Sequence, residues 1–176
     1  MDFKPARLKD VWLISLNRIG DDRGFFARTF CEEEFSAKGL PTQFVQQNMS
    51  LSNVKGTLRG FHFQKFPHDE DKLIRCVNGA IFDVVIDLRP DSDTYLQWES
   101  FELSDSNKDQ LLIPKGFAHG FQVLSDRAEV SYLVSNKYAP KAERGIRWDD
   151  PSFKVDWPLP PTEISDKDRN WPNFAA

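Results

Sequence analysis

The segment 72–88, KLIRCVNGAIFDVVIDL, gives the clearest structural signal in the chain. Two apolar runs flank Asn78 and Gly79, and an Asn-Gly pair suits the type I′ turn of a two-residue β-hairpin. The pattern therefore predicts two antiparallel strands, 72–77 and 80–88. Asp83 shares one face of the second strand with apolar residues, so we expect it to be a structural acid paired with a nearby Arg or Lys.

Further short strands are predicted on both sides of this hairpin. They cover 11–16, 25–30 and 43–50 before it, and 98–103, 110–113, 118–124 and 129–134 after it. The helices expected are a short one at 32–35 and one that begins at Ser165, with Asp168 completing a capping box. Many short strands with few helices indicate an all-β sandwich or barrel. At 176 residues, we expect one domain spanning 1–176.

Composition narrows the partners and the compartment. The formal net charge is −4 and no block of Lys or Arg occurs, which argues against nucleic acid and membrane surfaces as partners. The N-terminus does not resemble a signal peptide, and no run approaches the ~18 apolar residues of a membrane helix. Cys31 and Cys76 form neither a disulfide framework nor a zinc motif. We therefore expect a cytoplasmic protein with reduced cysteines.

The stretch 56–64, GTLRGFHFQ, places the first of three histidines in an apolar, aromatic run. If the strand alternates strictly, Gly60, His62 and Gln64 share one face and Arg59 lies on the other. An imidazole on an inward face is either satisfied by hydrogen bonds in the core or takes part in chemistry. This segment alone leaves both possibilities open.

The remaining sequence favours acid–base chemistry over the other common kinds of site. The three histidines are far apart in the chain and lack the spacing of a metal motif. No glycine-rich phosphate loop and no nucleophile elbow occur. The side chains left for proton transfer are His62, His119, Asp83, Asp168, Lys72, Tyr132 and Tyr138.

Eight short motifs extend over nearly the whole chain: DRGFF (22–26), QQN (46–48), LRGFHFQ (58–64), KLIRC (72–76), IPKGFAHGF (113–121), YAP (138–140), RWDD (147–150) and SDKD (165–168). Their sequences and their order resemble the dTDP-4-dehydrorhamnose 3,5-epimerase family. The resemblance implies an all-β cupin jelly-roll barrel with a few short peripheral helices. It also implies a homodimer that uses neither a metal nor a cofactor.

The resemblance further implies a role for each site residue. The substrate would be a dTDP-linked 4-keto-6-deoxy sugar, whose carbonyl acidifies the hydrogens on carbons 3 and 5. His62 would remove these protons in a dyad with Asp168, and Lys72 would stabilise the enolate oxygen. Tyr132 would return a proton from the opposite face, and Tyr138 would stack on the thymine ring. Other implied substrate-binding residues are Arg23, Gln46, Gln47, Asn48, Arg59, His119, Glu143 and Lys167.

Two positions fit the family pattern less simply. Members of the family often carry Glu where this chain has Arg28. An arginine donates hydrogen bonds whereas a glutamate carboxylate accepts them, so this wall of the site would bind different ligand groups. The family also uses both Arg59 and His62, although strict alternation separates them. Gly60 could permit a bulge that re-aims one side chain, or Arg59 could reach the site of a partner subunit.

These observations lead to one expected function and to open alternatives. The expected function is inversion of carbons 3 and 5 of dTDP-4-dehydro-6-deoxy-D-glucose to give dTDP-4-dehydro-L-rhamnose, in dTDP-rhamnose biosynthesis for cell-wall polysaccharide. One alternative is a single-centre epimerase acting on another nucleotide-linked 4-keto sugar. From other classes, a metal-dependent cupin oxygenase and a catalytically silent sugar-nucleotide binder are also open.

Overall fold

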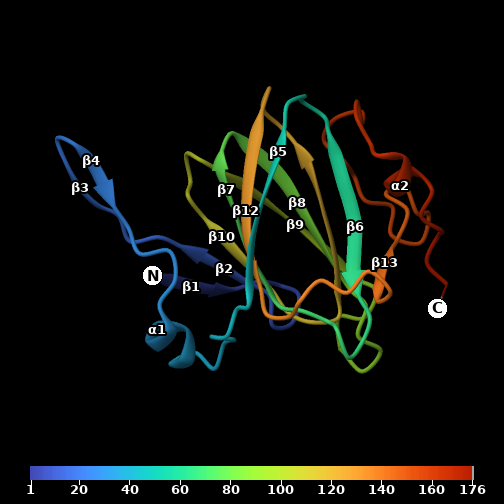
Figure 1. Ribbon diagram of the computed structural model, residues 1–176, viewed down its shortest axis with the longest axis horizontal. Helices are drawn as coiled ribbons and strands as arrows, with labels where there is room; N and C mark the ends of the chain where they lie inside the picture. Colours follow the sequence, from blue (N-terminus) through green and yellow to red (C-terminus); the bar gives the residue numbers. More distant parts are fainter. Residues whose placement is uncertain (176) are drawn as a thin grey trace.

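Antiparallel strands dominate the secondary structure of the computed structural model, which describes residues 1–175 (Figure 1). The prediction of an all-β chain with few short helices is therefore confirmed. The strands are β1 (Asp2–Pro5), β2 (Trp12–Ser15), β3 (Ile19–Asp21), β4 (Gly24–Phe26), β5 (Gln46–Ser52), β6 (Leu58–Gln64), β7 (Lys72–Asn78), β8 (Ala80–Asp87), β9 (Trp98–Ser104), β10 (Gln110–Ile113), β11 (Phe117–Val123), β12 (Ala128–Val134) and β13 (Glu143–Gly145). The helices are α1 (Glu32–Ser36) and α2 (Asp166–Arg169).

Two sheets face each other and form a jelly roll (Figure 1). One sheet has six strands in the order β1-β2-β10-β7-β12-β5, and the other has five in the order β13-β6-β11-β8-β9. Ile74 and Leu111 of the first sheet pack in one buried cluster with Val85 and Phe121 of the second. Alternate residues of the inner strands thus fill the space between the sheets, as sandwich packing requires.

Part of the outer face of each sheet is also covered. On the five-stranded sheet, Val84 and Ile86 pack against Phe153 and the partly buried Trp157 from the C-terminal segment. On the six-stranded sheet, Phe35 of α1 packs in a separate buried cluster. Burial on both faces explains why β8 reads as a nearly continuous apolar run instead of an alternating one.

The β7–β8 hairpin confirms the turn predicted at Asn78 and Gly79. Gly79 has a φ of +77°, and a Cβ at this position would collide with the backbone oxygen of Arg127. Its N–H donates to Oδ2 of Asp105 at 2.7 Å. A glycine is therefore required here for both conformation and space.

Other sequence-based expectations need correction. The short edge strands β1 and β13 were not predicted, and the strand expected at 25–30 extends only over Gly24–Phe26. That strand pairs with β3 in a separate hairpin that projects away from the two large sheets (Figure 1). Cys31 and Cys76 are both free, as expected. No helix in residues 1–175 is long and apolar enough to cross a membrane.

Candidate active site

A cavity of about 450 Å³ lies between the two sheets and is lined by polar side chains from both. Its volume falls in the range of small-molecule sites, about 300–1,000 Å³. The structure brings nine of the residues predicted for the site to its wall: Gln46, Asn48, Arg59, His62, Lys72, His119, Tyr132, Tyr138 and Glu143.

A bulge in β6 brings Arg59 and His62 to the same cavity. His62 pairs with His119 of β11, but Arg59 pairs with Phe121, so β6 carries one extra residue between the two pairs. Gly60 occupies the bulge with a φ of +129°, and a Cβ there would lie 2.5 Å from Cα of Gly120. The expectation from strict alternation, which separated Arg59 from His62, is therefore wrong, and a bulge at Gly60 explains the difference.

His62 and Asp168 form a close imidazole–carboxylate pair. Nε2 of His62 lies 2.6 Å from Oδ1 of Asp168, which is almost completely buried. The backbone N–H of Gly60 and Nε1 of Trp171 also donate to this carboxylate, each at 3.3 Å. Burial alone would raise the pKa of Asp168, but the hydrogen bond and charge of His62, helped by these donors, hold it below its ordinary value.

The carboxylate of Asp168 reaches His62 because α2 begins where the sequence predicted. Oγ of Ser165 caps the helix by accepting from the backbone N–H of Asp168 at 3.1 Å. The second half of the predicted capping box is wrong, because the Asp168 carboxylate turns toward His62 and does not return to the backbone of Ser165. The cap therefore fixes the backbone that presents the acid to the imidazole.

Tyr132 and Lys72 enter the cavity from the opposite sheet. Tyr132 lies on β12 and Lys72 on the neighbouring β7, while His62 lies on β6. Nζ of Lys72 is 3.3 Å from Oε1 of Glu70. Burial raises the pKa of Tyr132, and the negative charge of Glu70 adds to this effect. A molecule in the cavity would thus have an imidazole on one side and a protonated phenol on the other.

Glu70 also lines the cavity, although no sequence pattern predicted it as a site residue. Besides pairing with Lys72, it accepts a hydrogen bond from Nε2 of Gln64 at 2.7 Å. Glu70 lies in the loop before β7, and no family motif quoted above includes it. The only available signal was its position two residues before Lys72, which places both side chains on one face of an extended segment.

A second imidazole–carboxylate pair joins His119 to Asp83. Nε2 of His119 lies 2.8 Å from Oδ2 of Asp83, whose side chain is fully buried. The expectation that Asp83 would pair with Arg or Lys is wrong, because the pairing of β8 with β11 places His119 within reach. Burial raises the pKa of Asp83, and the opposing effect of His119 does not cancel that increase.

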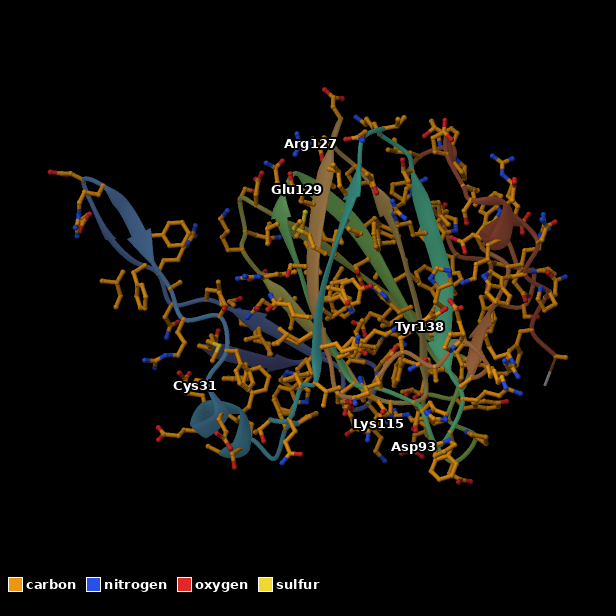
Figure 2. All side chains as sticks on the ribbon, in the orientation of Figure 1. Cys31, Asp93, Lys115, Arg127, Glu129 and Tyr138 are labelled. Carbon is orange, nitrogen blue, oxygen red and sulfur yellow. The ribbon has the colours of Figure 1, made fainter. Side chains whose placement is uncertain are left out.

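Tyr138, Glu143 and Lys167 form a chain of contacts at the mouth of the cavity. The hydroxyl of Tyr138 donates to Oε2 of Glu143 at 2.7 Å, and Nζ of Lys167 lies 2.5 Å from Oε1. Burial opposes ionisation of Glu143, but its bonds to Lys167 and Tyr138 lower its pKa overall. Figure 2 shows Tyr138 close to β6 and β13. Its ring is largely exposed and available to a ligand.

The other three predicted binding residues lie away from this cavity. Gln47 is on the outer face of β5, where Nε2 donates to Oγ of Ser131 at 3.3 Å. Arg23 is in the turn of the β3–β4 hairpin and pairs with Asp21. Arg28 follows that hairpin and lies 3.6 Å from Glu34 of α1. Within one chain, the structure does not bring these residues to the cavity.

Potential metal ligands do not gather in the part of the chain that the structure describes. Across residues 1–175, no group of three or more His, Cys, Asp or Glu side chains is placed to hold a metal ion. The two histidines of the cavity are each bound to a carboxylate, and His68 lies in the loop between β6 and β7.

Fold and cavity together define a class: a cupin-type jelly roll with acid–base side chains between its sheets. A family model described as dTDP-4-dehydrorhamnose 3,5-epimerase matches residues 5–176. The chain belongs to the dTDP-4-dehydrorhamnose 3,5-epimerase family.

Individual relatives agree with this assignment over nearly the full length. A dTDP-4-dehydrorhamnose 3,5-epimerase from Methanothermobacter thermautotrophicus is 49% identical over 96% of this chain and 92% of its own. The crystal structure of the Bacillus anthracis enzyme of that name, with TDP and PPi bound, superposes with a TM-score of 0.96 at 41% identity, covering 98% of this chain and 99% of the other. A dTDP-4-dehydrorhamnose 3-epimerase from Streptomyces niveus is 37% identical over 97% of this chain and 82% of its own.

Proposed function

We propose that the protein inverts carbons 3 and 5 of dTDP-4-dehydro-6-deoxy-D-glucose and so produces dTDP-4-dehydro-L-rhamnose. The observation that carries this proposal is His62 on one sheet, paired with Asp168 of α2 and facing Tyr132 across a cavity of about 450 Å³. Inversion requires a proton to leave one face of a carbon and another to arrive on the opposite face. Two proton-transfer groups on opposite sheets meet this requirement.

Proton removal is assigned to His62. Asp168 is kept ionised and accepts from Nε2, which leaves Nδ1 of the neutral imidazole with the lone pair that takes the proton. The carboxylate then stabilises the imidazolium that forms. A positioned base of this kind contributes about 10²–10⁴-fold to the rate.

The electron pair released from carbon moves onto the carbonyl oxygen at carbon 4, where Lys72 stabilises the enolate. Its ammonium group is held in the cavity by Glu70, at 3.3 Å. A fixed positive charge aimed at a developing negative charge is the oxyanion-stabilising arrangement. Neither the enolate nor its stabilisation calls for a metal or a cofactor.

Reprotonation is assigned to Tyr132. Burial raises the pKa of its phenol, so the hydroxyl carries its proton at neutral pH. Tyr132 approaches from the six-stranded sheet, opposite to His62. Transfer of the phenolic proton to the enolate carbon therefore inverts the centre.

The nucleotide is assigned to the mouth of the cavity. Tyr138 presents an exposed ring on which thymine can stack, and Arg59 and Lys167 supply charge for the diphosphate. Gln46, Asn48, His119 and Glu143 provide the remaining polar contacts with the sugar nucleotide.

We further propose that residues 1–176 act as one domain in a cytoplasmic homodimer that serves dTDP-rhamnose and cell-wall polysaccharide synthesis. The dimer is supported by the β3–β4 hairpin, in which Ile19, Phe25 and Phe26 are 73%, 50% and 67% exposed. Burial of such side chains against a second copy is favourable. The same contact would offer Arg23 and Arg28 to the cavity of the partner, which explains why they lie far from their own.

A single-centre epimerase is the second candidate, because the Streptomyces niveus relative bears the name 3-epimerase. Incubation with dTDP-4-dehydro-6-deoxy-D-glucose in heavy water separates the candidates. Deuterium at carbons 3 and 5 is the expected result, and deuterium at one carbon would favour the single-centre reaction. Deuterium at neither carbon, or stoichiometric iron in the purified active protein, would contradict the proposal.

A further inference from the structure

Two histidines of the cavity wall are each paired with a buried carboxylate in nearly the same geometry. Nε2 of His62 lies 2.6 Å from Asp168, and Nε2 of His119 lies 2.8 Å from Asp83. The two histidines are direct partners across the β6–β11 ladder, and both line the cavity. In each imidazole the nitrogen left for a ligand is therefore Nδ1.

The two carboxylates differ in the number of hydrogen-bond donors around them. Asp168 accepts hydrogen bonds from the backbone of Gly60 and from Trp171 as well as contacting His62. Within residues 1–175, the side chain of Asp83 is hydrogen-bonded to His119 alone, and its Oδ1 is buried without a hydrogen-bond partner. An ionised carboxylate is stable with several donors, but it is costly when one oxygen is buried and unpaired.

This difference sets the number of protons in each pair. Because Asp168 keeps its negative charge, the Asp168–His62 pair holds one proton between its two groups. This proton is on Nε2 of His62, so Nδ1 of His62 carries no hydrogen. Asp83 is stable only in a net-neutral pair with His119, which requires one more proton. Whether that proton resides on Asp83 or on Nε2, Nδ1 of His119 carries a hydrogen.

The charged groups around the second pair do not change this count. Lys72 of β7 lies near enough to favour ionised Asp83 slightly, but Glu70 pairs with Lys72 and offsets its charge. From β6, Arg59 faces the cavity, with its guanidinium bonded to Oγ of Ser52 and to the backbone oxygen of Leu51. The requirement for a neutral buried pair is therefore maintained.

We propose that Asp83 is a positioning residue that keeps His119 as a hydrogen-bond donor to the substrate carbonyl oxygen, while Asp168 keeps His62 as the base. The proposal rests on the proposed function. His119 is the cross-strand neighbour of His62, so its N–H lies beside the group that removes the proton. The carbonyl is one bond from each carbon that loses a proton, and its oxygen gains the negative charge that a donor stabilises.

Nitrogen NMR of the substrate-free protein tests the proton count directly. The chain has three histidines, so ¹⁵N-histidine labelling gives a simple spectrum, which His68→Gln and His119→Gln assign. At about pH 8, where an ordinary imidazole is neutral, we expect Nδ1 to be protonated in His119 and bare in His62. A bare Nδ1 in His119, or the same pattern in both rings, would overturn the proposal.

Kinetics of Asp83→Leu test the consequence for catalysis. Leucine has a similar size but can neither accept a hydrogen bond from Nε2 of His119 nor donate one to it, so the hydrogen is no longer held on Nδ1, and kcat should fall about tenfold or more while KM changes less than about threefold. Asp83→Leu combined with His119→Gln should be no slower than His119→Gln alone, because Asp83 acts through His119.

Asp87→Leu is the matched control, since Asp87 is a second fully buried acid on β8 and is held by Arg89, Ser92 and Thr94. It should lower stability but leave kcat of the folded protein and the His119 spectrum unchanged. Unchanged kcat in Asp83→Leu would overturn the proposal. If Asp83→Leu does not fold, the wild-type spectrum still decides. Absence of deuterium incorporation by the wild type would defeat the proposed function, while the spectrum would still report the proton count.

Discussion

At the scale of single residues, neighbours determine what each ionisable group can do. Two acids and two histidines line or support one cavity, yet Asp168 has several donors and Asp83 has one. Pairs of titratable groups whose environments push their pKa values apart are typical of acid–base sites. Lys72 and Tyr132 likewise take their character from Glu70, which holds the ammonium and helps to keep the phenol protonated.

Replacement of Tyr132 by Phe tests the assignment of the second proton-transfer group. The variant keeps the ring and its packing but loses the hydroxyl. We expect deuterium exchange from the substrate to continue while the yield of inverted product falls about 10²-fold or more. Stereochemical analysis of the sugar is the measurement, and normal inversion would exclude Tyr132 as the acid.

At the scale of elements, turns and helix caps that depend on adjacent residues could be predicted from the sequence. The Asn-Gly turn of β7–β8 and the Ser165 cap of α2 depend on neighbours in the sequence, and both were found where predicted. The partner of Asp83 depends on how β8 pairs with β11, and the register of two strands is set by long-range packing. Arg59 was misplaced for a similar reason, because alternation does not reveal a bulge.

The bulge in β6 makes Gly60 a sensitive position. An alanine there combines an unfavourable positive φ with a contact of 2.5 Å between Cβ and Cα of Gly120. We expect Gly60→Ala to lower the free energy of unfolding by about 2–4 kcal/mol and to disturb the His62–Asp168 pair. Denaturant unfolding measures the loss.

Gly39→Ala is the control for this comparison. Gly39 has a φ of +69°, but a Cβ there would meet nothing within 4 Å. Its loss should therefore be limited to the conformational cost, about 1 kcal/mol. Equal losses at the two positions would show that the close approach of β6 to β11 does not restrict residue 60.

At the scale of the whole molecule, two sheets hold opposing groups at a fixed separation while a projecting hairpin remains uncovered. The family motifs contain most residues of the cavity wall, and all of these wall residues belong to one chain. They did not reveal that Arg23, Arg28 and Gln47 lie elsewhere. A sequence of one chain does not specify which residues a second copy supplies.

The proposed dimer gives a prediction for the hairpin. Sedimentation of the wild type should give twice the chain mass of 20.3 kDa. The double change Phe25→Ser and Phe26→Ser should shift the protein to monomers, because it removes apolar surface that the dimer would bury. Phe66→Ser is the control, since Phe66 is 86% exposed outside the hairpin. A monomeric wild type would contradict the dimer.

The central claim is that His62 removes the substrate protons with the help of Asp168. The most direct measurement is deuterium incorporation into dTDP-4-dehydro-6-deoxy-D-glucose by His62→Ala in heavy water, with dTDP binding measured on the same sample. His68→Ala, altered in the loop between β6 and β7, is the control and should exchange normally. We predict that His62→Ala binds dTDP as the wild type does but incorporates no deuterium at carbon 3 or carbon 5. Exchange at the wild-type rate in His62→Ala would show that a group other than His62 removes the protons.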